Sequence, residues 1–286
     1  MGKTTIEWTD YTWNPVTGCM VHSPGCTNCY AMKLAGTRLK NLPSRRGLTR
    51  MSSAGPVWNG EVRFNREWLD QPMLWRSPRN IFVVAHGDLF YEKVEDLWIA
   101  AILHAMKAAT QHQYQVLTKR PDRAARILAS VPAQPNWLIG TSVEDQKRAD
   151  ERLAHLRAIA RQGWRTFVSY EPAIGPVDWS GWEFIKWMIS GGESGPDARP
   201  SHPDWHRATR DWCAAHGVPY FFKQYGAWAP LRDGHGGFLP DDARTCVRLR
   251  PNGTTGAGGC PMQLVGKKRA GRLLDGVEHN ELPGPS

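Results

Sequence analysis

Alternation between short apolar runs and amphipathic segments, from residue 80 to about residue 223, constrains the fold of this chain more than any other feature. Each run is rich in β-branched and aromatic residues. Such runs are typical of strands buried on both faces, as in a parallel sheet that helices cover. The predicted strands are residues 81–85, 114–118, 137–141, 166–170, 186–190 and 219–222.

The segments between these runs are predicted to be helices. In one of them, Leu97, Ala101 and Ala105 recur at helical spacing and predict an apolar face. Strand–helix alternation of this kind indicates successive βαβ units. With a further candidate strand at residues 6–9, the sequence predicts an α/β fold: a partial (β/α) TIM-like barrel of six or seven strands. An open doubly wound sheet is the alternative layout.

Domain boundaries follow from changes in composition. The barrel domain is expected to span residues 1–226, with an insertion at about 41–79 that contains prolines, glycines and several basic residues. From residue 227 glycines become frequent and the strand–helix alternation stops. We therefore expect residues 227–286 to form a small irregular C-terminal appendage, Gly-rich and basic, packed on the barrel.

Hydropathy and charge indicate the cellular location of the protein and the kind of partner that it binds. No stretch approaches the ~18 consecutive apolar residues of a membrane helix, so no membrane association is expected. Residues 1–8 lack the apolar run of a secretory signal, which predicts a cytoplasmic protein. The formal net charge of +9 favours a polyanionic partner such as a nucleic acid.

Three of the six cysteines crowd into one loop: Cys19, Cys26 and Cys29, with the spacing C-x6-C-x2-C. In a reducing compartment, clustered thiolates are typical of a metal site rather than of disulfides. A [4Fe–4S] cluster held by three cysteines leaves one iron open for an external ligand. That is the arrangement in which S-adenosylmethionine (SAM) is cleaved to a 5′-deoxyadenosyl radical. The loop follows the first predicted strand, which would place it at the barrel mouth that holds active sites.

Zinc is the alternative for this loop. His22 lies between the first two cysteines and gives C-x2-H-x3-C-x2-C, a set of four ligands for structural zinc. In that case the chain would be a zinc-stabilised nucleic-acid-binding protein without catalysis. Cys246 and Cys260 flank a Gly-rich loop and are a second, smaller candidate pair.

Polar residues follow six successive predicted strands, at the ends where barrel enzymes carry their chemistry. Ser142 and Glu144 are the candidates for accepting hydrogen bonds from the ribose hydroxyls of SAM. Asp88 or Glu193 would hold its ammonium group. Gly191-Gly192 would let the backbone approach a ligand closely. The full set is His86, Asp88, Thr118, Lys119, Ser142, Glu144, Tyr170, Glu171, Glu193, Ser194, Lys223 and Gln224.

Other members of this set are candidates for contact with substrate. Lys119, Arg120 and Lys223 would meet a phosphate or carboxylate, unless they pair with the neighbouring glutamates. Tyr170 would position substrate or donate a hydrogen atom. A tyrosine at the rim of the barrel without a catalytic role is the alternative for it.

Two basic runs are candidates for binding nucleic acid, because basic residues neutralise phosphates and exposed aromatic rings stack on bases. The alternative is a solvated surface over tryptophans that belong to the core. The first run is Arg38, Lys40, Arg45, Arg46 and Arg50, with Trp58, Trp68 and Trp75 nearby, and the second is Lys267, Lys268, Arg269 and Arg272.

The chain resembles a phage and bacterial three-cysteine-motif family classed with radical SAM enzymes. The resemblance covers nearly the whole chain, but the first cysteine gap is longer than the usual C-x3-C. His86-Gly87-Asp88 stands where Gly-Gly-Glu usually follows the second strand. The matching motifs are Trp13-Asn14-Pro15, Gly18-Cys19, Gly25 to Ala31, Leu117 to Pro121, Gly140 to Glu144, Ser169 to Pro172, Ser190 to Gly195, Phe222 to Gly226 and Val265 to Lys268.

The resemblance implies a barrel of the radical SAM type, a [4Fe–4S] cluster on the three cysteines, and SAM as cofactor. The implied function is to rearrange, modify or repair a nucleic-acid base, with phage DNA as one case and the host cytoplasm as the location if the gene is phage-encoded. A radical SAM enzyme acting on a small molecule or a peptide is the alternative. A partner protein that completes the site is left open.

Overall fold

The computed structural model describes residues 2–231 and 246–284. By contacts the chain divides into two compact units. The first unit is Met1–Thr141 with His155–Thr166 and Pro285–Ser286, and the second is Ser142–Ala154 with Phe167–Gly284.

Seven strands pair in the order β1-β6-β7-β8-β9-β10-β11, and the pairs β1–β6, β6–β7, β7–β8, β9–β10 and β10–β11 are parallel. A doubly wound sheet reverses its strand order at a switch point. Here the order follows the sequence without reversal, so the predicted partial (β/α) barrel is confirmed. The strands are β1 (Tyr11–Trp13), β6 (Asn80–Val83), β7 (Gln113–Thr118), β8 (Trp137–Ser142), β9 (Arg165–Tyr170), β10 (Met188–Gly191) and β11 (Tyr220–Gln224).

The first strand lies later in the chain than predicted. Residues 6–9 form a turn, in which the Thr9 amide donates to the Ile6 carbonyl at 3.4 Å. The Asp10 carboxylate then accepts from the Asn80 amide at 2.8 Å, which aligns β1 with β6. The strand prediction at 6–9 is therefore wrong, because polar side chains that cap a turn interrupt the apolar pattern.

Four longer helices separate the strands: α3 (Asp96–Ala108), α4 (Pro121–Leu128), α5 (Gln146–Arg161) and α6 (Pro203–His216). In α3 the buried residues include Ile99, Ile102 and Met106. Leu97 is 80% exposed and Ala101 is partly buried, whereas Ala105 is buried as predicted. The predicted apolar face is therefore wrong at its first residue, and Ile99 and Ile102 occupy the core there instead.

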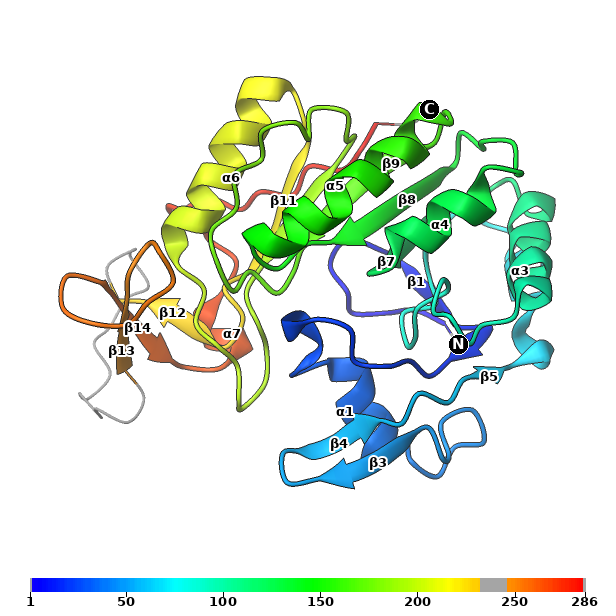
Figure 1. Ribbon diagram of the computed structural model, residues 1–286, viewed down its shortest axis with the longest axis horizontal. Coiled ribbons are helices and arrows are strands. Elements are labelled where there is room, and N and C mark those ends of the chain that lie inside the picture. Colours follow the sequence, from blue (N-terminus) through cyan, green and yellow to red (C-terminus); the bar gives the residue numbers. More distant parts are fainter. Residues whose placement is uncertain (1, 232–245, 285–286) are drawn as a thin grey trace. The chain divides into compact units, whose positions relative to one another are not determined.

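A small substructure of the first unit carries the cysteines (Figure 1). Helix α1 (Tyr30–Gly36) lies against a hairpin of β3 (Thr49–Ser52) and β4 (Gly55–Trp58). The two share a core of Ala31, Met32, Ala35, Leu48 and Trp58. The remaining elements of this region are β2 (Val16–Thr17), β5 (Arg63–Phe64), the 3-10 helices Pro24–Cys26 and Arg66–Trp68, and α2 (Gln71–Leu74).

The described part of the C-terminal region forms an antiparallel sheet in the order β12-β14-β13. Cys246 pairs with Gln263 and Cys260 with Leu249, so the two cysteines lie at opposite ends of one ladder, about 10 Å apart by strand rise. The candidate pairing of these thiols is therefore not formed. The elements are β12 (Trp228–Pro230), β13 (Cys246–Leu249), β14 (Cys260–Leu264) and α7 (Lys267–Ala270).

The predicted division at residue 227 stays a prediction, and residues 232–245 of that region lie outside the described part of the chain. Within the described residues, no helix has the length and apolar character needed to cross a membrane.

Candidate metal centre and polar site

The cysteine loop connects β2 to α1 and is fastened to the segment that follows β6. The Gly18 amide donates to the His86 carbonyl at 3.1 Å, and the Cys29 amide donates to the Cys26 carbonyl at 3.2 Å. Gly18 has φ +97°, and a Cβ atom there would lie 2.2 Å from the Glu61 carbonyl oxygen. Only glycine fits this position without a shift of the backbone. The loop therefore starts at the carboxyl ends of two neighbouring parallel strands.

Two of the three thiols contact the core under α1. Cys19 and Cys29 are partly buried against it, and Cys26 is buried. Burial raises the pKa of the Cys19 thiol, and the Asp88 carboxylate raises it further. Burial likewise raises the pKa of Cys29. Backbone hydrogen bonds and the charge of Lys119 lower this pKa and so offset part of the effect of burial. Each of these two thiols also senses the charge of Cys26, so the three are electrostatically coupled.

The donor chemistry of this loop fits a cluster with three cysteine ligands. Within residues 2–231 and 246–284, however, no three His, Cys, Asp or Glu side chains already converge as metal ligands. The four residues of the zinc set do not converge as ligands either, and His22 is exposed. The loop therefore supplies three coupled thiols, and their closing on a metal stays a prediction.

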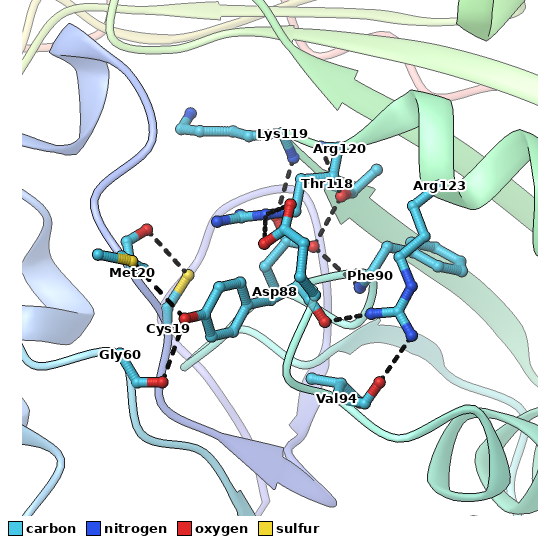
Figure 2. Close-up of polar contacts among 12 residues, drawn as sticks. Cys19, Met20, Gly60, Asp88, Phe90, Val94, Thr118, Lys119, Arg120 and Arg123 are labelled. Carbon is cyan, nitrogen blue, oxygen red and sulfur yellow. Dashed lines mark hydrogen bonds and ion pairs between the residues drawn. The ribbon is translucent and has the colours of Figure 1, made fainter.

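Beside the loop lies a polar network centred on Asp88, which follows β6 (Figure 2). Its Oδ1 accepts from the Thr118 hydroxyl at 2.7 Å and from the Phe90 amide at 3.0 Å. Its Oδ2 accepts from the Lys119 amide and from Arg120 Nη1, both at 3.0 Å. The buried carboxylate thus binds four donors of the protein and joins the ends of β6 and β7.

Arg120 extends this network toward the cysteines. Its Nε donates to both Glu92 oxygens, at 3.0 and 2.9 Å, and its guanidinium lies 4.6 Å from the centre of the Tyr91 ring. Burial lowers the pKa of Arg120, but the charges of Asp88, Cys19 and Glu92 outweigh burial and raise it. The Tyr91 hydroxyl donates to the Gly60 carbonyl at 3.1 Å and contacts Met20 Sδ at 3.7 Å (Figure 2). The network therefore ends at the residue after Cys19.

Four predicted site residues of the first unit are thus brought together: Asp88, Thr118, Lys119 and Arg120. The Asp88 carboxylate accepts hydrogen bonds from protein groups and acts as a positioning residue in this structure. Its contact with the SAM ammonium group stays a prediction. The Lys119 amide is held by Asp88, while its charge acts on Cys29. Arg120 pairs with Asp88 and Glu92, which is the structural alternative weighed for it.

In the second unit each predicted carboxylate has a basic partner. Glu144 and Arg152 are both buried and lie 2.8 Å apart, and Arg152 also donates to the Ser142 carbonyl at 2.7 Å. Glu193 accepts from Arg199 at 2.6 Å. Lys223 lies 3.0 Å from Glu171, which is the ion pair weighed as the alternative for this lysine.

Tyr170 does not lie at a rim. Its side chain is fully buried and its hydroxyl donates to the Gly175 carbonyl. Burial raises the pKa of this phenol well above its usual value. The prediction of a rim position is therefore wrong, because the β9 residue points into the core of the second unit.

Gly191 and Gly192 allow close approach within the protein. A Cβ at Gly192 would lie 2.0 Å from the Tyr225 carbonyl oxygen, and a Cβ at Gly191 would lie 3.0 Å from Glu171 Oε1. The Gly192 amide donates to the Gln224 carbonyl at 2.8 Å. The two glycines are thus required by the packing of β10 on β11, with or without a bound ligand.

The residues of the first basic run and its nearby tryptophans differ in burial: some are exposed and others belong to the core. Arg45 is buried with its guanidinium 6.0 Å from the Trp68 ring, and burial together with Arg63 lowers its pKa to about 10. Trp58 is 5% exposed and belongs to the core under α1. Both were candidates for nucleic-acid contact, and neither is available for it. In the second run, Arg272 is tied to the Lys223 carbonyl at 3.1 Å.

The model of a family described as "Protein of unknown function (DUF5131)" matches residues 3–283. The chain belongs to this family. No curated protein matches it. The match does not name the three-cysteine family that the motifs resemble, so that assignment stays a prediction.

Among solved structures, this DUF5131 chain is similar to spore photoproduct lyase complexed with dinucleoside spore photoproduct, with 13% identity, a TM-score of 0.44, and coverage of 94% of this chain and 74% of the other. It is also similar to a variant of that lyase with bound AdoMet and the same dinucleoside, with 14% identity, a TM-score of 0.46, and coverage of 92% and 72%. These TM-scores are too low to carry an argument, so the proposals below depend on the chain's own residues.

Several partners in the site escaped the sequence analysis. Tyr91 and Glu92 surround Arg120 but follow no strand end and belong to no motif. Arg152 and Arg199 follow their carboxylate partners by eight and six residues, on segments whose geometry the sequence does not reveal. His86 Nδ1 is buried without a partner among the described residues, and burial with the charge of Arg45 lowers its pKa to about 4.

Proposed function

We propose that this protein is a radical SAM enzyme in which Cys19, Cys26 and Cys29 hold a [4Fe–4S] cluster. The observation that carries the proposal is the attachment of the three-thiol loop to the carboxyl end of β6, through Gly18 and His86. In β/α barrels the active site lies at that end of the strands. A cluster held by these three thiols alone would leave one iron open for SAM.

A cluster held by Cys19, Cys26 and Cys29 would supply one-electron reduction of SAM. The protein's own task is to hold the donors and exclude water. On one side of Cys19 the network of Asp88, Arg120 and Tyr91 contacts the Met20 side chain, and on the other side Cys19 packs against the core under α1. The ammonium group of Lys119 acts on Cys29 and favours a negatively charged centre there.

The contacts with SAM are proposed as the sequence predicts them. Ser142 and Glu144 would accept from the ribose hydroxyls, and Glu193 or Asp88 would receive the ammonium group. Gly191 and Gly192 would border the cofactor, and Lys119 would contact the substrate. Tyr170, proposed from the sequence for the substrate, is fully buried and is assigned no contact with it. Each assignment is open to single substitution with SAM affinity as the readout.

We propose a nucleic-acid base as the substrate. The net charge of +9 supports a polyanionic partner, and residues 11–60, which include the cysteine loop, contain lysines and arginines but no Asp or Glu. A small-molecule or peptide substrate is the alternative, and it predicts no binding of oligonucleotides. A zinc-stabilised binding protein predicts metal loss on removal of His22.

The test is iron content after anaerobic reconstitution, with release of 5′-deoxyadenosine as the second readout. Cys19→Ala, Cys26→Ala and Cys29→Ala are each expected to lose the cluster and the release of 5′-deoxyadenosine. Cys246→Ala is the matched control, because it removes a partly buried thiol outside the loop. Full iron retention in all three loop variants would end the proposal.

A further inference from the structure

The segment that carries the cysteines contains no acidic residue between Asp10 and Glu61. The chain as a whole has 27 Asp and Glu in 286 residues, so an acid-free stretch of this length is a strong local bias. All of its charged side chains are cationic. They are Lys33, Arg38, Lys40, Arg45, Arg46 and Arg50.

Four of these cations form an exposed set, named here the basic face: Arg38, Lys40, Arg46 and Arg50. In the described part of the chain, none of the four forms an ion pair. Three arginines elsewhere in the fold, Arg120, Arg152 and Arg199, are each neutralised by a carboxylate. Positive charge on the basic face therefore has no carboxylate partner among residues 2–231 and 246–284.

The basic face is built directly on the candidate metal centre. Arg38 and Lys40 follow α1, Arg46 precedes the β3–β4 hairpin, and Arg50 lies in β3. Helix and hairpin pack without a gap, because a Cβ at Gly36 would lie 2.1 Å from Pro56 Cβ. Their common core is also the core against which Cys19 and Cys29 pack. A ligand held by these cations would be held on the same small substructure as the thiols.

We propose that the basic face binds the phosphate backbone of a nucleic-acid strand and so brings the strand to the cysteine loop. This inference rests on the proposed function, and it names the surface that recognises the substrate. Three of the four cations are arginines, whose planar guanidinium forks bind phosphate oxygens in pairs. Each contact releases condensed counterions, which makes the binding depend strongly on salt.

A membrane surface fits the same cations less well. A helix that lies on a membrane keeps a continuous apolar side for the lipid. The apolar side of α1, with Ala31, Met32 and Ala35, is already buried on the hairpin. The exposed apolar side chains nearest the face, Leu42 and Met51, are single residues on separate segments.

The test is fluorescence anisotropy of a labelled single-stranded oligonucleotide of about 20 residues, and of its duplex, over a salt titration. The triple variant Arg38→Gln, Arg46→Gln and Arg50→Gln is expected to bind at least roughly tenfold more weakly at low salt, with the salt slope reduced by about 2 to 3. The matched control is Lys107→Gln, Arg161→Gln and Lys186→Gln. It removes the same charge from exposed cations outside the segment and is expected to bind as the parent does.

Iron content and thermal stability are measured on the same variants. These measurements distinguish loss of the cluster from loss of nucleic-acid binding by the basic face. The basic-face variant is expected to keep its iron and its melting temperature. Equal loss of oligonucleotide binding in the control would overturn the inference, and so would unchanged binding in the basic-face variant. Binding to vesicles with anionic lipid, lost in the basic-face variant while oligonucleotides do not bind, would replace the nucleic acid with a membrane. Loss of iron in the loop-cysteine variants has no bearing on these outcomes.

Discussion

Asp88 Oδ2 and Arg120 Nη1 lie 3.0 Å apart, in an ion pair whose two side chains are 7% and 3% exposed. The pair joins the end of β6 to the end of β7, and through Tyr91 it reaches the residue after Cys19. A pair buried this deeply is costly to break, because Arg120 then keeps only the more exposed carboxylate of Glu92 as its partner. The Asp88–Arg120 pair therefore contributes to the stability of the fold beside the cysteine loop.

Replacing Asp88 by Asn is expected to lower the free energy of unfolding by about 3 kcal/mol, since Arg120 loses a buried counter-charge. Urea denaturation measures this change. Asp122→Asn is the control, because the Asp122–Arg126 pair is exposed and is worth less than about 1 kcal/mol. Similar losses in the two variants would contradict the structural role of the buried pair.

Gly18→Ala is expected to distort the loop and reduce iron content after reconstitution, because the new Cβ would meet the Glu61 carbonyl. Gly47→Ala provides the comparison: Gly47 also has positive φ, at +77°, but nothing lies within 4 Å of its Cβ position. The cost at Gly47 is then backbone strain alone, on the order of 1 kcal/mol, with iron unchanged. An equal iron content in both variants would show that the close approach at Gly18 does not matter.

His206 gives a pH-dependent contribution to stability. Its ring is fully buried between the Ser190 and Ser201 hydroxyls, at 2.6 and 2.8 Å, and burial lowers its pKa to about 3. The unfolded chain binds a proton on this residue below its ordinary pKa of about 6.5, while the folded chain does not. Stability is therefore expected to fall as the pH drops from about 6.5 toward about 3, by up to about 1.4 kcal/mol per pH unit.

The measurement for His206 is the free energy of unfolding across that pH range, in the parent and in His206→Gln. The glutamine variant is less stable at neutral pH but is expected to show a flatter dependence on pH. A parent curve that stays level, or a variant curve of equal slope, would show that this histidine is not held neutral.

His22→Ala separates the two metal chemistries of the loop. The cluster proposal uses only the three cysteines, and His22 is exposed, so this variant is expected to keep iron and fold normally. Metal analysis after reconstitution gives the answer. Release of zinc from the variant, with zinc bound by the parent, would favour the binding protein without catalysis.

The parallel strands could be predicted because residues such as Ile81, Val116 and Phe167 are buried from both faces and leave continuous apolar runs. The first strand could not, because Tyr11 to Trp13 has no such run and is aligned through Asp10. Trp58 is a second residue whose place could not be predicted from the sequence. An aromatic residue in a basic, Gly-containing segment resembles a base-stacking residue until its packing under α1 is known.

Within the candidate site, the residue types at the strand ends were predictable and their partners were not. Asp88 meets Thr118 and Arg120 across 30 and 32 residues of sequence, a meeting that depends on the register of β6 and β7. Tyr170 was misplaced because one residue decides which side of a strand faces the core. The charge bias of residues 11–60 was visible in the sequence, and only burial separated Arg45 from its exposed neighbours.

Metal analysis of the protein purified without oxygen tests the central claim most directly. Iron, sulfide and zinc are measured together with the visible spectrum. The account predicts a brown protein with about four irons and about four sulfides per chain, as a [4Fe–4S] cluster requires. A colourless protein that carries stoichiometric zinc and takes up no iron on reconstitution would contradict it.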